Sequence, residues 1–90
     1  MSKYLNVIGP ACHKLRNKRG WTQEQVAAKC TIAGFNMSRG IYANIEIQNR
    51  KVSDFELVYL ARVFRVGPEE LLPKKMPSWT KNIVTGHCKE

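Results

Sequence analysis

The sequence has no long hydrophobic run, few acidic residues and only three cysteines. None of its apolar stretches approaches the ~18 residues that a membrane span requires, and its N-terminus lacks the pattern of a secretory signal peptide. We therefore expect no membrane association. Cys12, Cys30 and Cys88 are an odd number without the spacing of a disulfide framework. Reduced thiols of this kind are typical of a cytoplasmic protein.

The patterns of catalysis are also missing. There is no Ser/His/Asp set, no paired-carboxylate cluster and no glycine-rich phosphate loop. Two Cys–His neighbours, Cys12-His13 and His87-Cys88, supply enough ligand types for zinc. However, Cys12 falls on an apolar stripe and the second pair lies in a segment without regular pattern, which favours a buried thiol and an exposed pair. We predict no enzyme, no metal and no cofactor.

The scarcity of acidic residues leaves a strongly basic chain. Lysine and arginine number 15 against 7 aspartate and glutamate, giving a formal net charge of +8. Between positions 14 and 51 the basic residues are Lys14, Arg16, Lys18, Arg19, Lys29, Arg39, Arg50 and Lys51. This imbalance favours a polyanionic partner, most simply nucleic acid, although basic surfaces also bind membranes and acidic proteins.

Local signals divide the chain into short helices within one small domain. Gly9-Pro10 predicts the start of a first helix, because proline is tolerated in the first turn, and Gly20 predicts its end. Capping boxes predict two further starts. The predicted caps are Thr22 with Gln25, Ser38 for a helix to about Ile47, Ser53 with Glu56, and Pro68 at the first position of a short last helix.

Hydrophobic spacing predicts which side chains form the core. The residues expected inside are Ile8, Ala11, Cys12, Leu15, Val26, Ala27, Cys30, Ile41, Tyr42, Ile45, Leu57, Leu60, Ala61, Phe64, Leu71 and Leu72, with Ile32 and Phe35 beneath the central corner. Residues 1–73 are expected to form the domain, beginning with a frayed lead over 1–6. Residues 74–90 read as a tail, either flexible or docked through Trp79, Ile83 and Val84.

Three segments together resemble the helix-turn-helix domain of the Cro/phage-repressor (lambda-repressor-like) family of transcriptional regulators. They are LRNKRGWTQEQVA, SRGIYANIE and FELVYLARVFRVGPEELL, and the resemblance extends over residues 8–72. It implies an all-α fold of five helices. One departure is that about five additional residues lie between Lys29 and Phe35, with Thr31 in the place of the usual turn glycine. Either the second helix is longer, or Ala33 and Gly34 belong to a small loop.

The resemblance also implies roles for individual residues. On the third helix Arg39, Gly40, Ala43 and Asn44 would read base edges, since arginine can bond guanine and asparagine can bond adenine. An ordinary solvated helix face is the alternative. The residues expected at phosphates are Thr22, Gln23, Asn49, Arg50, Lys51, Lys18 and Arg19. Arg16 and Glu46 would form a partly buried ion pair.

We therefore predict a sequence-specific, double-stranded DNA-binding regulator, a repressor of bacterial or mobile-element type. The recognition helix Ser38–Ile47 would enter the major groove, and the chain would bind a near-palindromic site as a homodimer. One alternative is a protein-interaction module, such as an antitoxin or adaptor, that contacts a protein partner through the apolar tail. A second alternative is non-specific nucleic-acid binding driven by the net charge.

Overall fold

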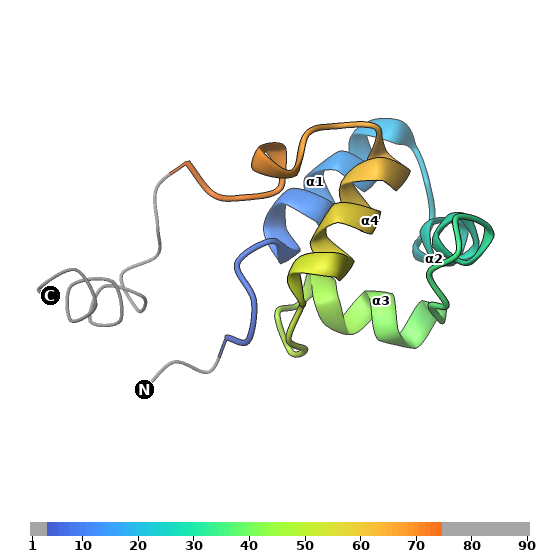
Figure 1. Ribbon diagram of the computed structural model, residues 1–90, viewed down its shortest axis with the longest axis horizontal. Coiled ribbons are helices and arrows are strands. Elements are labelled where there is room, and N and C mark those ends of the chain that lie inside the picture. The colour runs from blue at the N-terminus through green and yellow to red at the C-terminus, as the bar shows by residue number, and fades with distance from the viewer. Residues whose placement is uncertain (1–3, 75–90) are drawn as a thin grey trace, which may run out of the picture.

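The computed structural model describes residues 4–74, which form four α-helices and one turn of 3-10 helix (Figure 1). The elements are α1 (Gly9–Arg19), α2 (Gln23–Ile32), α3 (Arg39–Glu46), α4 (Asp54–Phe64) and η1 (Pro68–Glu70). No strand occurs within this range. No helix in it is long and apolar enough to cross a membrane.

The prediction of five helices is wrong for the last one. Pro68 does begin a helical turn, but η1 contains only three residues and is of the 3-10 type. Pro73 follows closely and disfavours the α conformation in the residue before it, so the chain has room for a single turn only. The all-α class is confirmed for residues 4–74.

The predicted helix caps are present with the expected hydrogen bonds. Thr22 Oγ1 accepts from the backbone N–H of Gln25 at 3.0 Å, and Gln25 Oε1 accepts from the N–H of Thr22 at 2.8 Å. Ser53 and Glu56 form the second capping box, which begins α4. Gly20 ends α1 in the left-handed conformation at φ +71°, a geometry that strains residues with a side chain. These caps fix the helix ends.

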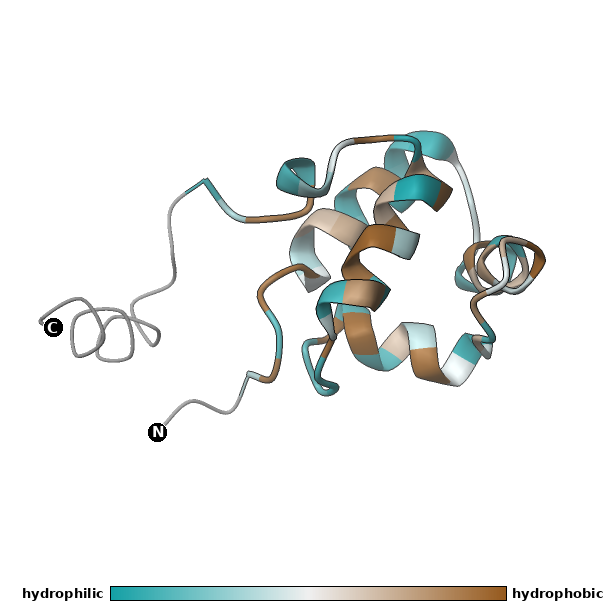
Figure 2. Cartoon of the chain, in the orientation of Figure 1, coloured by the Kyte–Doolittle hydropathy of each residue, from teal (hydrophilic) through white to brown (hydrophobic). Residues whose placement is uncertain are grey.

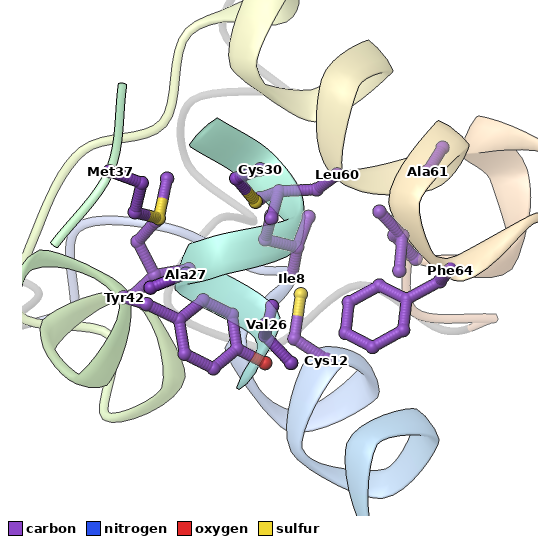
Figure 3. Packing of buried hydrophobic residues seen from close by; sticks show 12 residues of the cluster. Ile8, Cys12, Val26, Ala27, Cys30, Met37, Tyr42, Leu60, Ala61 and Phe64 are labelled. Atoms are coloured by element: carbon purple, nitrogen blue, oxygen red, sulfur yellow. The ribbon is translucent and has the colours of Figure 1, made fainter. Parts of the chain in front are cut away.

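The core lies where the helices meet: α3 contacts α1 and α2, and α4 contacts α2 and η1. Figure 3 shows Phe64 and Leu60 of α4 facing Cys12 of α1 and Val26 of α2. The buried apolar residues are Ile8, Cys12, Val26, Ala27, Cys30, Met37, Tyr42, Ile45, Leu60, Ala61, Phe64 and Leu71. Most of the predicted core is therefore confirmed.

Three predicted core residues are exposed instead: Ile32 by 85%, Leu72 by 42% and Ile41 by 38%. Ile32 is the clearest case. It follows the buried Cys30 by two helical positions, about 200° around the axis, so its side chain leaves the core face. Phe35 turns back, and its ring stacks on Tyr59 with centroids 5.4 Å apart.

The corner between α2 and α3 has features of both predicted arrangements, a continued second helix and a small loop. The helix α2 continues past Thr31, which donates its hydroxyl to the carbonyl oxygen of Ala27 at 3.1 Å. A small loop also follows, in which Gly34 has φ +101°. The same Thr31 hydroxyl lies 3.2 Å from the carbonyl oxygen of Met37, which ties the loop to the helix.

The expected fraying of residues 1–6 is wrong for Asn6. Its side chain is buried, and its Nδ2 donates to the carbonyl oxygens of Ile45 at 3.1 Å and Arg50 at 2.8 Å. Its Oδ1 accepts from two backbone N–H groups at the start of α1, at 3.1 and 2.9 Å. One amide therefore holds together the start of α1, the end of α3 and the loop that follows.

Gly9 permits the same close approach. A Cβ atom at this position would lie 2.6 Å from the carbonyl oxygens of both Ile45 and Glu46. Only glycine allows α1 to begin this near to the end of α3. Among the other expectations, the tail beyond Lys74, including Trp79 and the His87-Cys88 pair, lies outside the described residues.

Candidate nucleic-acid interface

The helix α3 turns one face inward and the other to solvent. Tyr42 and Ile45 are fully buried, which leaves the opposite side for the residues predicted to read bases. Arg39, Gly40 and Asn44 are exposed, and Ala43 is half-buried. The Oγ of Ser38 accepts from the N–H of Ile41 at 3.1 Å, so that Arg39 and Gly40 lie in the first turn of the helix.

The space around Gly40 is open. No atom lies within 4 Å of the position that a Cβ would take, in contrast to Gly9. The fold therefore does not require glycine at this position, and the bare backbone is available to a partner. In Figure 2 the chain around the start of α3 alternates between hydrophobic and hydrophilic residues, as expected of a helix with one buried face.

A single carboxylate at the end of α3 links three helices. Glu46 Oε2 accepts from Arg16 Nε of α1 at 2.6 Å, and its Oε1 accepts from Arg16 Nη2 at 3.2 Å. The amide Nε2 of Gln23, in the first turn of α2, donates to the same Oε1 at 3.1 Å. Arg16 also donates to the carbonyl oxygen of Trp21 at 2.9 Å. The structure thus contains the ion pair that the resemblance implied, and adds Gln23 to it.

The electrostatics of this network are those of a buried but well-paired carboxylate. Burial alone would raise the pKa of Glu46, but its interactions with Arg16 above all, and with Tyr42, Gln23 and His13, lower it from 4.5 to about 2. Hydrogen bonding to Glu46 raises the pKa of Arg16. Burial raises the pKa of Tyr42 above its ordinary value of 10, and the Glu46 carboxylate raises it further. The pair is therefore charged at neutral pH, and Tyr42 is neutral.

The neighbouring His13 contacts the same network. Its Nδ1 lies 3.1 Å from Glu46 Oε1 and 3.3 Å from Arg16 Nη2. Its Nε2 lies 3.0 Å from Asn17 Nδ2. His13 therefore belongs to the polar cluster around Glu46. Its sequence neighbour Cys12 is buried in the core.

The sequence predicts that Arg50 and Lys51, in the loop after α3, bind phosphate, but Arg50 is already engaged in an ion pair. Arg50 donates to both carboxylate oxygens of Glu56, at 3.1 and 3.0 Å. This pairing lowers the pKa of Glu56. Asn49 and Lys51 are exposed. The loop therefore presents Lys51 as an accessible charge, while Arg50 anchors the loop to the start of α4.

The remaining predicted phosphate contacts fall on two surfaces. Gln23 gives one amide N–H to Glu46 and retains the other, and the Thr22 hydroxyl is engaged in its cap. Lys18 is exposed near the end of α1. Arg19 belongs to another surface, since its guanidinium carbon lies 5.5 Å from the ring centroid of Trp21.

Sequence reasoning missed two residues that position this site. The sequence predicts a frayed lead over residues 1–6, and no local pattern indicates that Asn6 has partners 39 and 44 positions away. His13 stands out in the sequence only as a possible metal ligand. A signal was available for His13, because it lies three residues before Arg16 and therefore on the same side of the helix.

The family comparison agrees with this architecture. A family model described as helix-turn-helix matches residues 13–71, well over half of the chain. The chain belongs to this family, in its Cro/phage-repressor (lambda-repressor-like) form, a class of DNA-binding transcriptional regulators.

One solved structure with the same fold is the crystal structure of the DNA-binding domain of BldD. Its TM-score is 0.66 and its sequence identity 26%, and the match covers 81% of this chain and 100% of that one. No curated protein matches the sequence.

Proposed function

We propose that the protein is a sequence-specific regulator that binds double-stranded DNA through the exposed face of α3. It acts as a repressor of bacterial or mobile-element type, located in the cytoplasm, by occupying a site that the transcription machinery needs. Membership of the helix-turn-helix family supports DNA binding, and the solved relative is itself named as a DNA-binding domain. The proposal goes beyond DNA binding in two respects, which are sequence specificity and repression.

The observation that carries the proposal is the exposed face of α3. Arg39 and Asn44 are two side chains able to make bidentate contacts with bases, to guanine and adenine respectively. They share a solvent-facing side with Gly40, where open space allows close approach. The opposite side of α3 is fixed by full burial of Tyr42 and Ile45, so that the reading face is rigid.

Phosphate contacts would flank this face. The free N–H of the Gln23 amide, with the N-terminal end of α2, can donate to one backbone phosphate. Lys51 and Asn49 follow α3 and would contact the other side of the groove. Lys18 adds a charge on α1. Thr22 and Arg50 would contribute mainly by fixing backbone geometry, through the cap of α2 and the ion pair with Glu56.

A homodimer on a near-palindromic site is the proposed assembly. The helix α4 leaves Phe55 77% exposed and Val58 45% exposed, side by side at helical spacing. Large exposed apolar groups of this kind suit a contact with a second copy. This face of α4 is therefore our preferred dimer surface.

Selection of bound duplexes from a random pool tests the proposal directly. We expect a consensus with two inverted half-sites about one helical turn apart. A reporter whose promoter overlaps the selected site should be expressed less when the protein is present. Recovery of a pool with no consensus would reject sequence-specific binding.

Two matched substitutions separate base reading from phosphate binding. Arg39→Ala should relax the preference at one base position, with a loss of about 1–3 kcal/mol at the preferred base. Lys51→Ala should weaken binding to all sequences alike and reduce the salt slope by about one. Lys74→Ala removes the same charge elsewhere and serves as the control. Equal, sequence-blind losses from Arg39→Ala and Lys51→Ala would contradict the assigned reading face.

The rival functions give different results in the same titrations. Strong salt dependence without sequence preference would identify a non-specific nucleic-acid binder. Absence of duplex binding at low salt would favour a protein-interaction module, such as an antitoxin or adaptor. In that case the partner would be sought first for the apolar residues Trp79, Ile83 and Val84 of the tail.

A further inference from the structure

A second basic surface lies away from α3. It is a cleft of about 520 Å³ between the last turns of α1, α2 and α4. In Figure 1, α3 lies along the lower edge of the molecule and the ends of α1 and α4 lie at the upper edge. We define the basic cleft by six of its lining residues, Arg19, Lys29, Arg62, Arg65, Trp21 and Phe64.

The charge of the basic cleft is of one sign. No aspartate or glutamate lines it. Within residues 4–74 the side-chain ion pairs join Arg16 to Glu46 and Arg50 to Glu56, and none involves the four cations of the cleft. Like charges gathered in this way repel one another, and an occupant that carries several negative charges would relieve the repulsion.

The floor and rim of the cleft are apolar. Trp21 stacks on the buried Phe64 with ring centroids 5.8 Å apart and an angle of 19° between the planes. Lys29 Nζ lies 4.6 Å from the Trp21 ring centroid. At the rim Ile32 is 85% exposed, the most exposed of the large hydrophobic residues in the described chain. An occupant with apolar side chains among its charges would cover these groups.

The backbone at Arg65 adds an independent observation. Arg65 ends α4 in the left-handed conformation, with φ 58° and ψ 48°. Glycine is the usual residue at such a helix end, because a side chain strains the backbone there. At Arg65 this helix end instead adds a fourth cation to the cleft, at a cost in backbone strain that the charged side chain does not itself relieve.

We propose that the basic cleft binds an acidic segment of a partner protein that carries apolar side chains between its carboxylates. Four cations on the ends of three helices require several separated negative charges, which an extended acidic segment supplies. Trp21 and Ile32 provide the contacts for its apolar groups. The surface is separate from the exposed face of α3, so the protein can bind DNA and this partner together.

The test uses the full chain and a fluorescein-labelled peptide of aspartates and glutamates with interspersed leucines. Fluorescence anisotropy should report saturable binding, which weakens by about threefold for each cation removed, as expected for solvent-accessible ion pairs. Arg65→Gly is the sharpest variant, because it removes a charge from the cleft while relieving the backbone. Arg62→Ala removes a second charge, and Lys74→Ala is the control outside the cleft.

Two further measurements address the apolar contacts. A peptide with serine in place of leucine should bind more weakly, and Ile32→Ser should remove most of that difference. In the Trp79→Phe variant Trp21 is the sole tryptophan, and its emission should change when the leucine peptide is added. These outcomes, with normal duplex binding by Arg65→Gly, would support the proposal.

The proposal is overturned if Arg65→Gly and Arg62→Ala bind the peptide as tightly as Lys74→Ala does. It is also overturned if the serine peptide binds equally well, because the interaction would then be charge alone. Competition by an unrelated duplex that depends on the same arginines would make the cleft a nucleic-acid surface instead. The result is independent of the DNA proposal: peptide binding without a selected duplex site would reject only the latter.

Discussion

Replacing Glu46 by glutamine should destabilise the protein by about 3 kcal/mol at neutral pH, the range expected for breaking a buried ion pair. The Glu46 side chain is only 4% exposed, and that of Arg16 is 14% exposed. Glutamine has nearly the same shape, so packing is preserved. The substitution removes the charge that Arg16 requires, and it places an amide NH2 group where two donors now converge on a carboxylate oxygen.

The lowered pKa of Glu46 independently gives the size of this loss of stability. A carboxyl whose pKa falls from 4.5 to about 2 on folding contributes about 3 kcal/mol at neutral pH, because ionisation favours the folded state. Since the folded pKa is the lower one, this contribution is complete well above pH 4.5. It is lost as the pH falls from 4.5 towards about 2. Glutamine does not titrate, so the variant lacks this part of the acid sensitivity.

Urea unfolding followed by circular dichroism measures both effects. The free energies of unfolding of the natural chain and Glu46→Gln should differ most at pH 7 and converge as the pH approaches 2. Glu70→Gln, at an exposed glutamate, should change the stability by less than about 0.5 kcal/mol and controls for net charge. Equal stability of the natural chain and Glu46→Gln at pH 7 would refute the reasoning, as would a difference that does not depend on pH.

Three other substitutions test positions that the structure singles out. Asn6→Ala should cost about 1–3 kcal/mol in urea unfolding, because two backbone N–H groups and two carbonyls lose their partner. Gly9→Ala should cost about 1–3 kcal/mol, because the added methyl group would overpack against α3. Gly40→Ala should instead stabilise the protein by about 0.5–1 kcal/mol, because the space there is open. If Gly40→Ala were the more destabilising of the two, the close approach of α1 to α3 at Gly9 would be refuted. Phe55→Glu should leave unfolding at low protein concentration nearly unchanged but abolish self-association in sedimentation equilibrium; a persistent dimer would exclude the α4 face.

The features that the sequence could predict are those encoded within a few residues. The capping boxes at Thr22 and Ser53 and the glycine end at Gly20 involve partners three or four positions away, so their spacing is sufficient evidence. Exposure of Arg39 and Asn44 follows in the same way from the spacing of Tyr42 and Ile45 on α3.

Features that depend on distant segments could not be predicted in this way. The partners of Asn6 are set by where α3 ends, and the role of Gln23 in the Glu46 network requires the packing of α2 on α3. The sequence predicts Ile32 beneath the corner, but the direction of its side chain depends on how far α2 continues. Arg50 is intermediate, because its partner Glu56 is close in sequence but also caps α4. The capping pattern uses Oε1 of Glu56 and gives no sign that Oε2 accepts from Arg50.

The lengthened corner need not alter how α2 and α3 are set against each other. The corner, residues 33–37, joins the end of α2 to the start of α3. The Glu46 network joins the opposite ends, because Gln23 lies in the first turn of α2 and Glu46 in the last turn of α3. Two tethers at opposite ends fix the pair more firmly than either alone. The corner therefore closes one end of the pair through the Gly34 loop, while Glu46 holds the end of α3 near the start of α2.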